Sequence, residues 1–248
     1  GDVFFATPDP AYLDKTNATV IHAAAGLPEA AGAYDLAGSS RSAVAAVRAA
    51  HGTAGPGHQT VAVASDLRTG LPGSADEREG GDGATALVFG TDDPAAEVLS
   101  TASVSTEFLD RWRTPGRHES QQWEERFGQE VYGPLVGRAV DGALAEADLE
   151  IGAVDHVIVA GLHVRATKDA VRSIGATAEQ LVDDLTLTAG NLGAAQPWTM
   201  LSSLLDRAAA NRTILVVVLA DGADALVLRT TEHLVAAQEQ RRATGTSS

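Results

Sequence analysis

The feature that most constrains the fold is a seven-residue motif that occurs twice in the chain. Asp82-Gly-Ala-Thr-Ala-Leu-Val88 returns as Asp221-Gly-Ala-Asp-Ala-Leu-Val227. Each copy follows an apolar run of strand length, and a helix-like segment precedes each run. The same order of turn, helix, strand, connection and strand in both parts of the chain indicates an internal duplication. Strands that alternate with helices favour an α/β architecture with layered sheets.

The duplication gives two polar residues equivalent places. Ser40 lies one helix before the run Thr60–Ser65, and Asn191 lies one helix before the run Thr213–Ala220. A long polar stretch, 66–82, interrupts the first part. Because helix starts of a doubly built α/β fold can converge on one pocket, we expect the two side chains to share a site.

A Gly/Ser turn that runs straight into a helix surrounds Ser40. Gly38 permits a backbone conformation that other residues resist, and residues 41–50 are good helix formers without Gly or Pro. Ser39 or Ser40 can cap this helix by accepting from its free N–H groups. The same position suits a nucleophile, because helix N–H groups can hold a developing oxyanion. The local sequence leaves both interpretations open.

Charge and composition exclude several classes of function. The formal net charge of −15 repels phosphate backbones, so nucleic acid is not an expected partner. No apolar run approaches the roughly 20 residues of a membrane span, so no membrane association is expected. The chain has no cysteine, and its histidines, His118 among them, lack the spacing of a metal site. The cytoplasm is the expected compartment.

A histidine follows a predicted strand in the second part of the chain. The run Val154–Ala160 is typical of a buried strand, and Gly161-Leu-His163 comes at its C-terminal end. A charged segment with scattered aromatic residues separates the two parts. We therefore divide the chain into a first half, 1–104, a linker, 105–132, and a second half, 133–248.

Five motifs occur in a fixed order along the chain. They are Asp35-Leu-Ala-Gly-Ser-Ser-Arg41, Gly80-Gly-Asp-Gly-Ala-Thr-Ala-Leu-Val88, Gly161-Leu-His163, Gly190-Asn-Leu-Gly-Ala-Ala195 and Ala220-Asp-Gly-Ala223. In this order they resemble the thiolase superfamily, and in particular its branch with 3-oxoacyl-ACP synthase III and 3-hydroxy-3-methylglutaryl-CoA synthase. The resemblance implies a duplicated fold with α-β-α-β-α layers. It also implies a first half that is truncated, because the family's opening strand–helix units precede the part that Gly1 matches.

The resemblance further implies roles for individual residues. Ser40 stands where the family normally has a nucleophilic cysteine, and serine needs a base to activate it. His163 matches a histidine that acts as general base or polarises a thioester oxygen, and Asn191 matches a donor to that oxygen. The N–H of Ser40 and the backbone of Gly222 and Ala223 would form an oxyanion hole. The implied substrate is a coenzyme A thioester, with no permanently bound cofactor.

His163 and Asn191 each also have a purely structural interpretation. His163 can be a strand-end histidine that makes one structural hydrogen bond. Asn191 can be a turn residue that tolerates a left-handed backbone. The sequence alone does not choose between these interpretations and the catalytic ones.

Three functions stay open at this point. The first is Claisen-type acyl transfer from an acyl-CoA, which makes or breaks a carbon–carbon bond through an acyl-Ser40 intermediate. The second is an aldol-type lyase or synthase that acts on a CoA thioester without a covalent intermediate. The third is a non-catalytic subunit that binds acyl-CoA.

Two protein partners are expected. We predict a homodimer that forms through the strand Thr60–Ser65. The resemblance implies a second candidate, a small zinc-ribbon/OB-fold protein, since members of this branch often pair with one.

Overall fold

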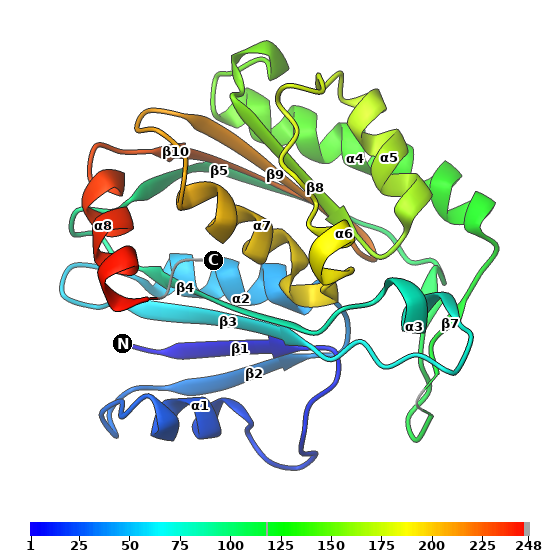
Figure 1. The fold of residues 1–248 in the computed structure, drawn as a ribbon, viewed down its shortest axis with the longest axis horizontal. Coiled ribbons are helices and arrows are strands. Elements are labelled where there is room, and N and C mark those ends of the chain that lie inside the picture. Colours follow the sequence, from blue (N-terminus) through cyan, green and yellow to red (C-terminus); the bar gives the residue numbers. More distant parts are fainter. Residues whose placement is uncertain (118, 246–248) are drawn as a thin grey trace.

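The structure is a computed structural model that describes residues 1–117 and 119–245. His118 and the end of the predicted C-terminal half, 246–248, lie outside the described residues. Helical layers and sheets alternate through the molecule (Figure 1), so that two sheets enclose one helical layer and carry further helices outside. The expected α/β fold with α-β-α-β-α layers is confirmed.

The first sheet contains four strands in the order β2-β1-β3-β4. β1 (Val3–Thr7) pairs in parallel with β2 (Ala33–Ala37) and with β3 (Thr60–Asp66), and β4 (Gly83–Phe89) runs antiparallel to β3. Because β3 lies between β1 and β4, both of its edges are already hydrogen-bonded. A homodimer through Thr60–Ser65 therefore cannot form by edge pairing at this strand, and the homodimer itself stays a prediction.

The second sheet contains four strands in the order β5-β10-β9-β8. They are β5 (Ala96–Ser105), β8 (His156–Gly161), β9 (Thr213–Leu219) and β10 (Gly222–Thr230). β8 and β9 are parallel, whereas β10 runs antiparallel to both of its neighbours. Every residue of β9 is buried, as expected for an apolar strand covered on both faces.

β5 is a strand that the sequence pattern did not predict. It pairs along β10 from Ala96 to Ser105. The predicted end of the first half, residue 104, falls within this strand, and the change from the first sheet to the second comes before Ala96.

The two copies of the repeated motif have the same local structure. They form β4 and β10, and each of these strands turns back antiparallel on the strand before it. The connections differ, because Ala220 and Asp221 alone join β9 to β10, whereas residues 67–82 join β3 to β4 and include α3 (Ala75–Glu79).

The helices fill and cover the sheets. α2 (Ser42–Thr53) and α7 (Gln196–Leu205) lie between the sheets, where they share one apolar core with both of them (Figure 1). α4 (Glu125–Glu146) and α5 (Val164–Ser173) cover the outer face of the second sheet and form a second core with it. α1 (Ala18–Ala24) covers part of the first sheet from outside.

The start of α1 is set by a distant side chain. The carboxylate of Asp35 on β2 accepts from the N–H groups of Asn17 and Ala18, each at 2.6 Å. The remaining short elements are β6 (Arg111–Trp112), β7 (Gln121–Gln122), η1 (Ile151–Ala153), α6 (Thr186–Ala189), η2 (Gly193–Ala195) and α8 (Leu234–Thr244). In residues 1–117 and 119–245 no helix is both long and apolar enough to cross a membrane.

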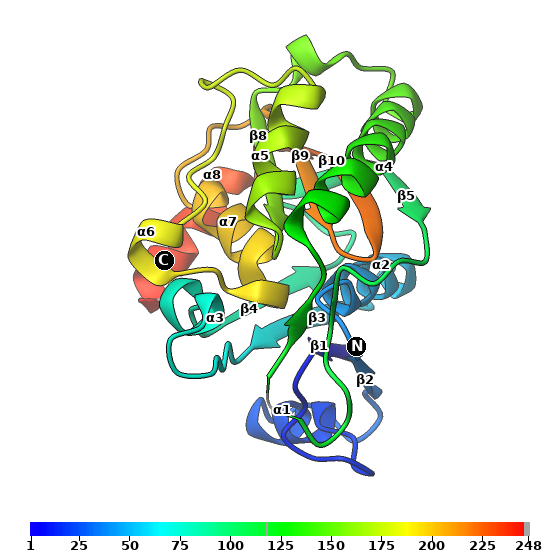
Figure 2. The ribbon, with the colours of Figure 1, turned by 90° about the vertical axis from the view of Figure 1, so that its right-hand side faces the viewer.

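The segment between β5 and α4 crosses from the second half to the first. It contains the small β6–β7 ladder, and Figures 1 and 2 show it running past the ends of β1 and β3 toward α1. Arg113 anchors it there, because its guanidinium donates to Asp9 Oδ1 at 3.0 Å and to the carbonyl of Pro8 at 3.1 Å. The predicted linker, 105–132, thus includes the first turns of α4, which begins at Glu125.

Candidate active site

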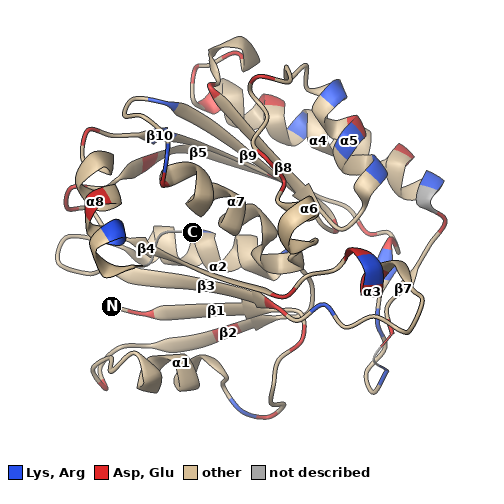
Figure 3. Ribbon diagram, in the orientation of Figure 1, with Lys and Arg blue, Asp and Glu red and all other residues tan. Residues whose placement is uncertain are grey.

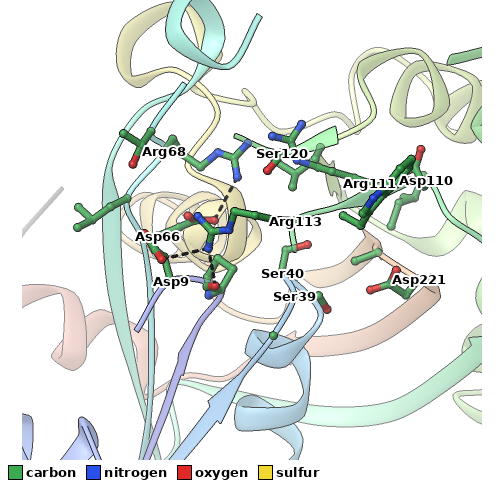
Figure 4. Close-up of a pocket in the computed structure, with 18 of the residues that line it drawn as sticks. Asp9, Ser39, Ser40, Asp66, Arg68, Asp110, Arg111, Arg113, Ser120 and Asp221 are labelled. Atoms are coloured by element: carbon green, nitrogen blue, oxygen red, sulfur yellow. Dashed lines mark hydrogen bonds and ion pairs between the residues drawn. The ribbon is translucent and has the colours of Figure 1, made fainter. Parts of the chain in front are cut away.

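A cavity of about 110 Å³ opens where the two halves of the chain meet (Figure 4). The turn before α2, the ends of β1 and β3, the linker and the turn between β9 and β10 form its walls. Both halves therefore supply polar side chains to it. Those that matter below are Ser40, Asp66, Arg68, Asp110, Tyr132 and Asp221.

Ser40 lies in the wall of this cavity, two positions before the first residue of α2. Ser39 takes the local turn contact, because its Oγ accepts from the N–H of Arg41 at 3.3 Å. Within the part of the chain that the structure describes, neither the hydroxyl nor the N–H of Ser40 has a hydrogen-bond partner. Ser40 does not cap α2, so both groups are available to a molecule in the cavity.

In the turn that contains the predicted oxyanion residues Gly222 and Ala223, it is the preceding residue that lines the cavity. Asp221 lines the cavity on the same side as Ser39 and Ser40 (Figure 4), whereas Gly222 and Ala223 are buried behind it. Gly222 has a φ of +136°, and a Cβ there would lie 2.2 Å from the carbonyl oxygen of Val104. The turn can therefore pass this close to β5 only with glycine at that position.

His163 is buried at the N-terminus of α5, with 2% of its surface exposed. Its Nδ1 accepts from the N–H of Ala166 at 3.0 Å, so the neutral ring carries its proton on Nε2. The structural hydrogen bond that the sequence allowed is thus present. In this tautomer Nε2 is a donor, which suits polarisation of an oxygen better than removal of a proton.

Asp110 and Tyr132 stand between His163 and the cavity, and the sequence reasoning missed both. The Tyr132 hydroxyl donates to Asp110 Oδ2 at 3.0 Å, and the tyrosine ring packs edge-on to His163 with centroids 6.1 Å apart. A Cβ on Gly128 would lie 2.7 Å from His163 Nε2 and 2.9 Å from Asp110 Oδ1, so these two atoms face one small space. The signal in the sequence that could have pointed to them was a carboxylate, Asp110, among the aromatic residues of the linker.

Burial changes the acidity of Tyr132. The side chain is 3% exposed, and burial together with the Asp110 carboxylate raises the pKa of Tyr132 far above its ordinary value. The hydroxyl therefore stays protonated at any physiological pH and acts as a fixed hydrogen-bond donor.

Asn191 makes structural hydrogen bonds in the predicted turn. Its side-chain amide donates to the carbonyl of Gly161 at 3.0 Å, and its Oδ1 accepts from the N–H of Gly193 at 3.0 Å. Its backbone N–H donates to the carbonyl of Glu79 at 2.7 Å, which ties the turn to the 66–82 insertion. One amide hydrogen is left for a ligand, because a primary amide has two.

The three predicted catalytic side chains do not meet in one cavity. Ser40 lines the first cavity, whereas Asn191 lines a second cavity of about 900 Å³ beside it. His163 lines neither of these two. Leu162, which precedes the histidine, borders both cavities, as do Arg68 and Arg111.

Asp66 is a buried carboxylate that the sequence reasoning also missed. It lies at the end of β3 and is 1% exposed. Burial raises the pKa of Asp66, although the Arg68 guanidinium and the N–H of Ala194 act in the opposite direction. The Ala194 N–H donates to Asp66 Oδ2 at 3.0 Å, which docks the start of the second half's central helix on the first sheet.

Basic side chains gather on the second cavity. Arg78 on α3 and Arg165 and Lys168 on α5 all line it, and Figure 3 shows Lys and Arg on both helices. Asp76, Glu79 and Asp184 line the same cavity, so positive charge is in excess there but is partly balanced. In residues 1–117 and 119–245 no group of three or more His, Asp or Glu side chains could hold a metal ion.

Two kinds of comparison found related proteins, while no protein-family model matched the chain. The hydroxymethylglutaryl-CoA synthase of Picrophilus torridus is 28% identical over 240 residues, which cover 95% of this chain and 68% of that protein. A crystal structure of HMG-CoA synthase complexed with CoA has a TM-score of 0.82 at 16% identity and covers 99% of this chain and 68% of that one. For 3-oxoacyl-ACP synthase III of Aquifex aeolicus the TM-score is 0.79 at 16% identity, with 92% and 76% covered.

In sequence the chain is similar to HMG-CoA synthases, and in fold it is similar to the thiolase-like branch of 3-oxoacyl-ACP synthase III and HMG-CoA synthase. The duplicated thiolase-like fold is thereby confirmed, and the relatives named above are condensing enzymes. Ser40 stands where the resemblance implies a nucleophilic cysteine, and the chain has no cysteine in its 248 residues.

Proposed function

We propose that this thiolase-like chain is an acyl-CoA-dependent enzyme that makes or breaks a carbon–carbon bond by Claisen chemistry, with Ser40 as the nucleophile. The observation that carries the proposal is the state of Ser40. Its hydroxyl and its N–H both lack partners within the described residues, and both belong to the wall of a cavity shared by the two halves.

In the proposed first step the Ser40 oxygen attacks the thioester carbonyl carbon. The hydroxyl proton passes to a carboxylate of the cavity, for which Asp110 and Asp221, both in its wall, are the candidates (Figure 4). The C–S bond then breaks, and coenzyme A leaves as a thiol with that proton, so the carboxylate is regenerated. The Ser40 N–H is placed to donate to the oxyanion formed on the way.

In the proposed second step an enolate of another acyl group attacks the acyl-Ser40 carbonyl. A carboxylate of the cavity takes the α-proton when the enolate forms. The new C–C bond then forms as the ester C–O bond breaks, and that proton passes to the Ser40 oxygen. The reverse sequence cleaves the same bond. Serine is a weaker nucleophile than cysteine, so the proposal predicts slow acylation unless a carboxylate assists.

The second cavity is the proposed site for the nucleotide part of coenzyme A. Arg78, Arg165 and Lys168 supply positive charge along it, which suits the phosphates of that ligand. The arrangement is supported by a structural neighbour that was solved as HMG-CoA synthase complexed with CoA. Residues of two different cavities would then hold the two ends of one substrate.

Intact-mass measurement after incubation with a panel of acyl-CoAs tests the proposal. We expect a gain of one acyl group in the wild type and none in Ser40→Ala, with the size of the gain naming the acyl group. Ser39→Ala is the matched control, because Ser39 lines the same cavity but is engaged with the Arg41 N–H. An adduct that survives in Ser40→Ala would contradict the assignment of the nucleophile.

A second candidate is an aldol-type lyase or synthase that acts on a CoA thioester through an enolate. The tautomer of His163 favours it, because a ring whose Nδ1 already accepts from the Ala166 N–H is not a base for Ser40 through that atom, and a route without a covalent intermediate needs no activated serine. Turnover of a CoA thioester in the absence of an adduct, unaffected by Ser40→Ala and abolished by His163→Ala, would identify this function. Binding of acyl-CoA without turnover would leave the third function, a non-catalytic subunit.

Assembly and location are part of the proposal. The outer edge of β2 is open in the described part of the first sheet, so a second copy would pair there rather than at β3. A zinc-ribbon/OB-fold protein remains the proposed heterologous partner, and the cytoplasm the proposed compartment. Molar mass by light scattering, alone and with such a protein, tests both partners.

A further inference from the structure

We propose that Arg41 is a positioning residue that, held by Asp224, fixes Ser40 against the Asp221–Gly222 turn of the other half. The inference rests on the proposed role of Ser40 as nucleophile. It concerns a different group, which touches no substrate and acts through the serine beside it.

The guanidinium of Arg41 joins the Ser40 turn to three points of the second sheet. Its Nε donates to Asp224 Oδ2 on β10 at 2.9 Å, and its Nη1 donates to the carbonyl of Asp221 at 2.7 Å. Its Nη2 donates to the carbonyl of Val104 on β5 at 3.3 Å. These bonds leave little freedom for the residue that immediately precedes Arg41 in the chain.

The acceptor of this contact is itself held in place. The Asp224 side chain is 4% exposed, and its Oδ1 also accepts from the Ser103 hydroxyl at 2.5 Å. Arg48, two turns further along α2, donates to the same hydroxyl at 2.5 Å. A buried carboxylate with several donors is costly to disturb, because removal of one partner leaves charge without compensation.

The repeated motif offers a comparison inside the molecule. Asp224 occupies the fourth position of the second copy, and Thr85 occupies the fourth position of the first. Thr85 also contacts a central helix, since its hydroxyl lies 2.5 Å from that of Thr199 on α7. Both copies thus anchor a helix of the middle layer, but the charged anchor occurs where the helix carries Ser40.

The proposed reaction gives a reason why an ion pair, and not a hydroxyl pair, anchors the helix that follows Ser40. Ser40 comes from the first half and the Asp221–Gly222 turn comes from the second, so their separation depends on how the halves are held together. A displacement of about 1 Å in a reacting group can cost roughly 100-fold in rate. A multidentate guanidinium fixes such a distance better than a hydroxyl pair, because its donors have a rigid planar geometry.

The test measures acylation and binding separately in Arg41→Lys and Asp224→Asn. The probe is the acyl-CoA that labels the wild type fastest, and the readouts are the saturating rate of adduct formation and the half-saturating concentration. We expect the rate to fall about 100-fold, while the half-saturating concentration stays near that of the wild type at a temperature at which each variant is folded. The double variant should be no slower than the slower single variant, since both break one contact.

Arg212→Lys is the matched control. Arg212 pairs with Asp155 at the same 2.9 Å, at the opposite end of the second sheet from the cavity, and its replacement should leave acylation unchanged. If Arg41→Lys does not fold, Arg41→Ala with millimolar guanidinium ion replaces it, and restoration of the acylation rate is the expected result.

The outcomes separate this inference from the proposed function. Wild-type acylation rates in folded Arg41→Lys and Asp224→Asn would overturn the positioning role and leave Ser40 as nucleophile. Binding and acylation could instead fall equally, together with the thermal midpoint and without rescue by guanidinium. That result would show that Arg41 has only a structural role. A wild type that forms no adduct at Ser40 would overturn the proposed function and this inference together.

Discussion

β4 and β10 carry the same motif but lie in different surroundings. Val88 in β4 is 65% exposed, whereas the equivalent Val227 in β10 is completely buried. β10 lies between β9 and β5 and faces an apolar core on each side, while β4 has β3 on one edge and a core on one face. The motif therefore specifies a turn and a strand, and the layers around the strand decide how much each residue contributes to stability.

The largest expected difference comes from a charge at this valine. Val227→Asp places a carboxylate in a dry core and should cost at least about 4 kcal/mol of unfolding free energy, enough to unfold many domains. Val88→Asp should cost less than about 1 kcal/mol, because the side chain already meets water. Urea unfolding of both variants measures the contrast, and equal costs would mean that β4 is as buried as β10 in solution.

The glycine of the motif gives the next contrast. Gly222→Ala would force a Cβ to within 2.2 Å of a backbone oxygen at a φ of +136°, whereas at Gly83 a Cβ would meet the Leu192 side chain at 3.0 Å. We expect Gly222→Ala to cost about 2–3 kcal/mol and Gly83→Ala about 1 kcal/mol or less. Thermal unfolding compares them. A larger loss at Gly83 would show that the strain is not where the geometry places it.

A pH series tests the buried carboxylate at the end of β3. Burial raises the pKa of Asp66 above its ordinary 3.8, so the folded protein binds this proton more tightly than the unfolded chain does. The resulting stabilisation is fully present below the unfolded pKa and is lost as pH rises through the folded one. The unfolding free energy of the wild type should therefore fall relative to that of Asp66→Asn as pH rises from acid to neutral.

Asp221→Asn, just after the equivalent end of β9, is the control. It shows whether the pH dependence of the unfolding free energy is specific to Asp66 in the first half. Urea unfolding at each pH supplies the free energies for both variants. A wild-type advantage over Asp66→Asn that grows toward neutral pH would mean that the ion pair with Arg68 outweighs burial.

The smallest expected effect on stability concerns the sheet edges. The β8 edge is covered, because Val157 exchanges backbone hydrogen bonds with Gln180 and Val182, whereas the outer edge of β2 is open in the described structure. Tyr34→Lys on β2 should cost under about 0.5 kcal/mol, since the side chain is 52% exposed. Light scattering should nevertheless report a shift from dimer to monomer, while Leu181→Lys on the covered edge leaves the mass unchanged.

Local signals predicted the parts of the fold that depend on near neighbours. The Gly38 turn, the start of α2 and the all-apolar β9 follow from residue types and spacing alone. β5 could not be found that way, because Ser100 and Ser103 interrupt its apolar pattern and their partners come from distant elements, α2, α4 and β10. Strand order was also beyond local sequence, so the place of β3 between β1 and β4 could not be predicted.

In the candidate site, too, local sequence predicted some features, whereas others depend on distant contacts. Ser40 lies in the wall of a cavity between the halves, a place that its turn and the duplication suggested, while its catalytic role stays a prediction. The tautomer of His163 depends on the Ala166 N–H, and its separation from Ser40 depends on Asp110 and Tyr132 in the linker. Contacts between segments so far apart in sequence arise from tertiary packing, which no spacing rule encodes.

The linker hairpin has one further consequence. Arg111 pairs with Asp76 and Arg113 pairs with Asp9, so ionic contacts attach this segment to the first half beside the cavity mouth. Partly exposed ion pairs weaken as dissolved salt screens them. The association rate of small molecules at Ser40 should therefore depend on the salt concentration of the buffer, although the site itself is unchanged.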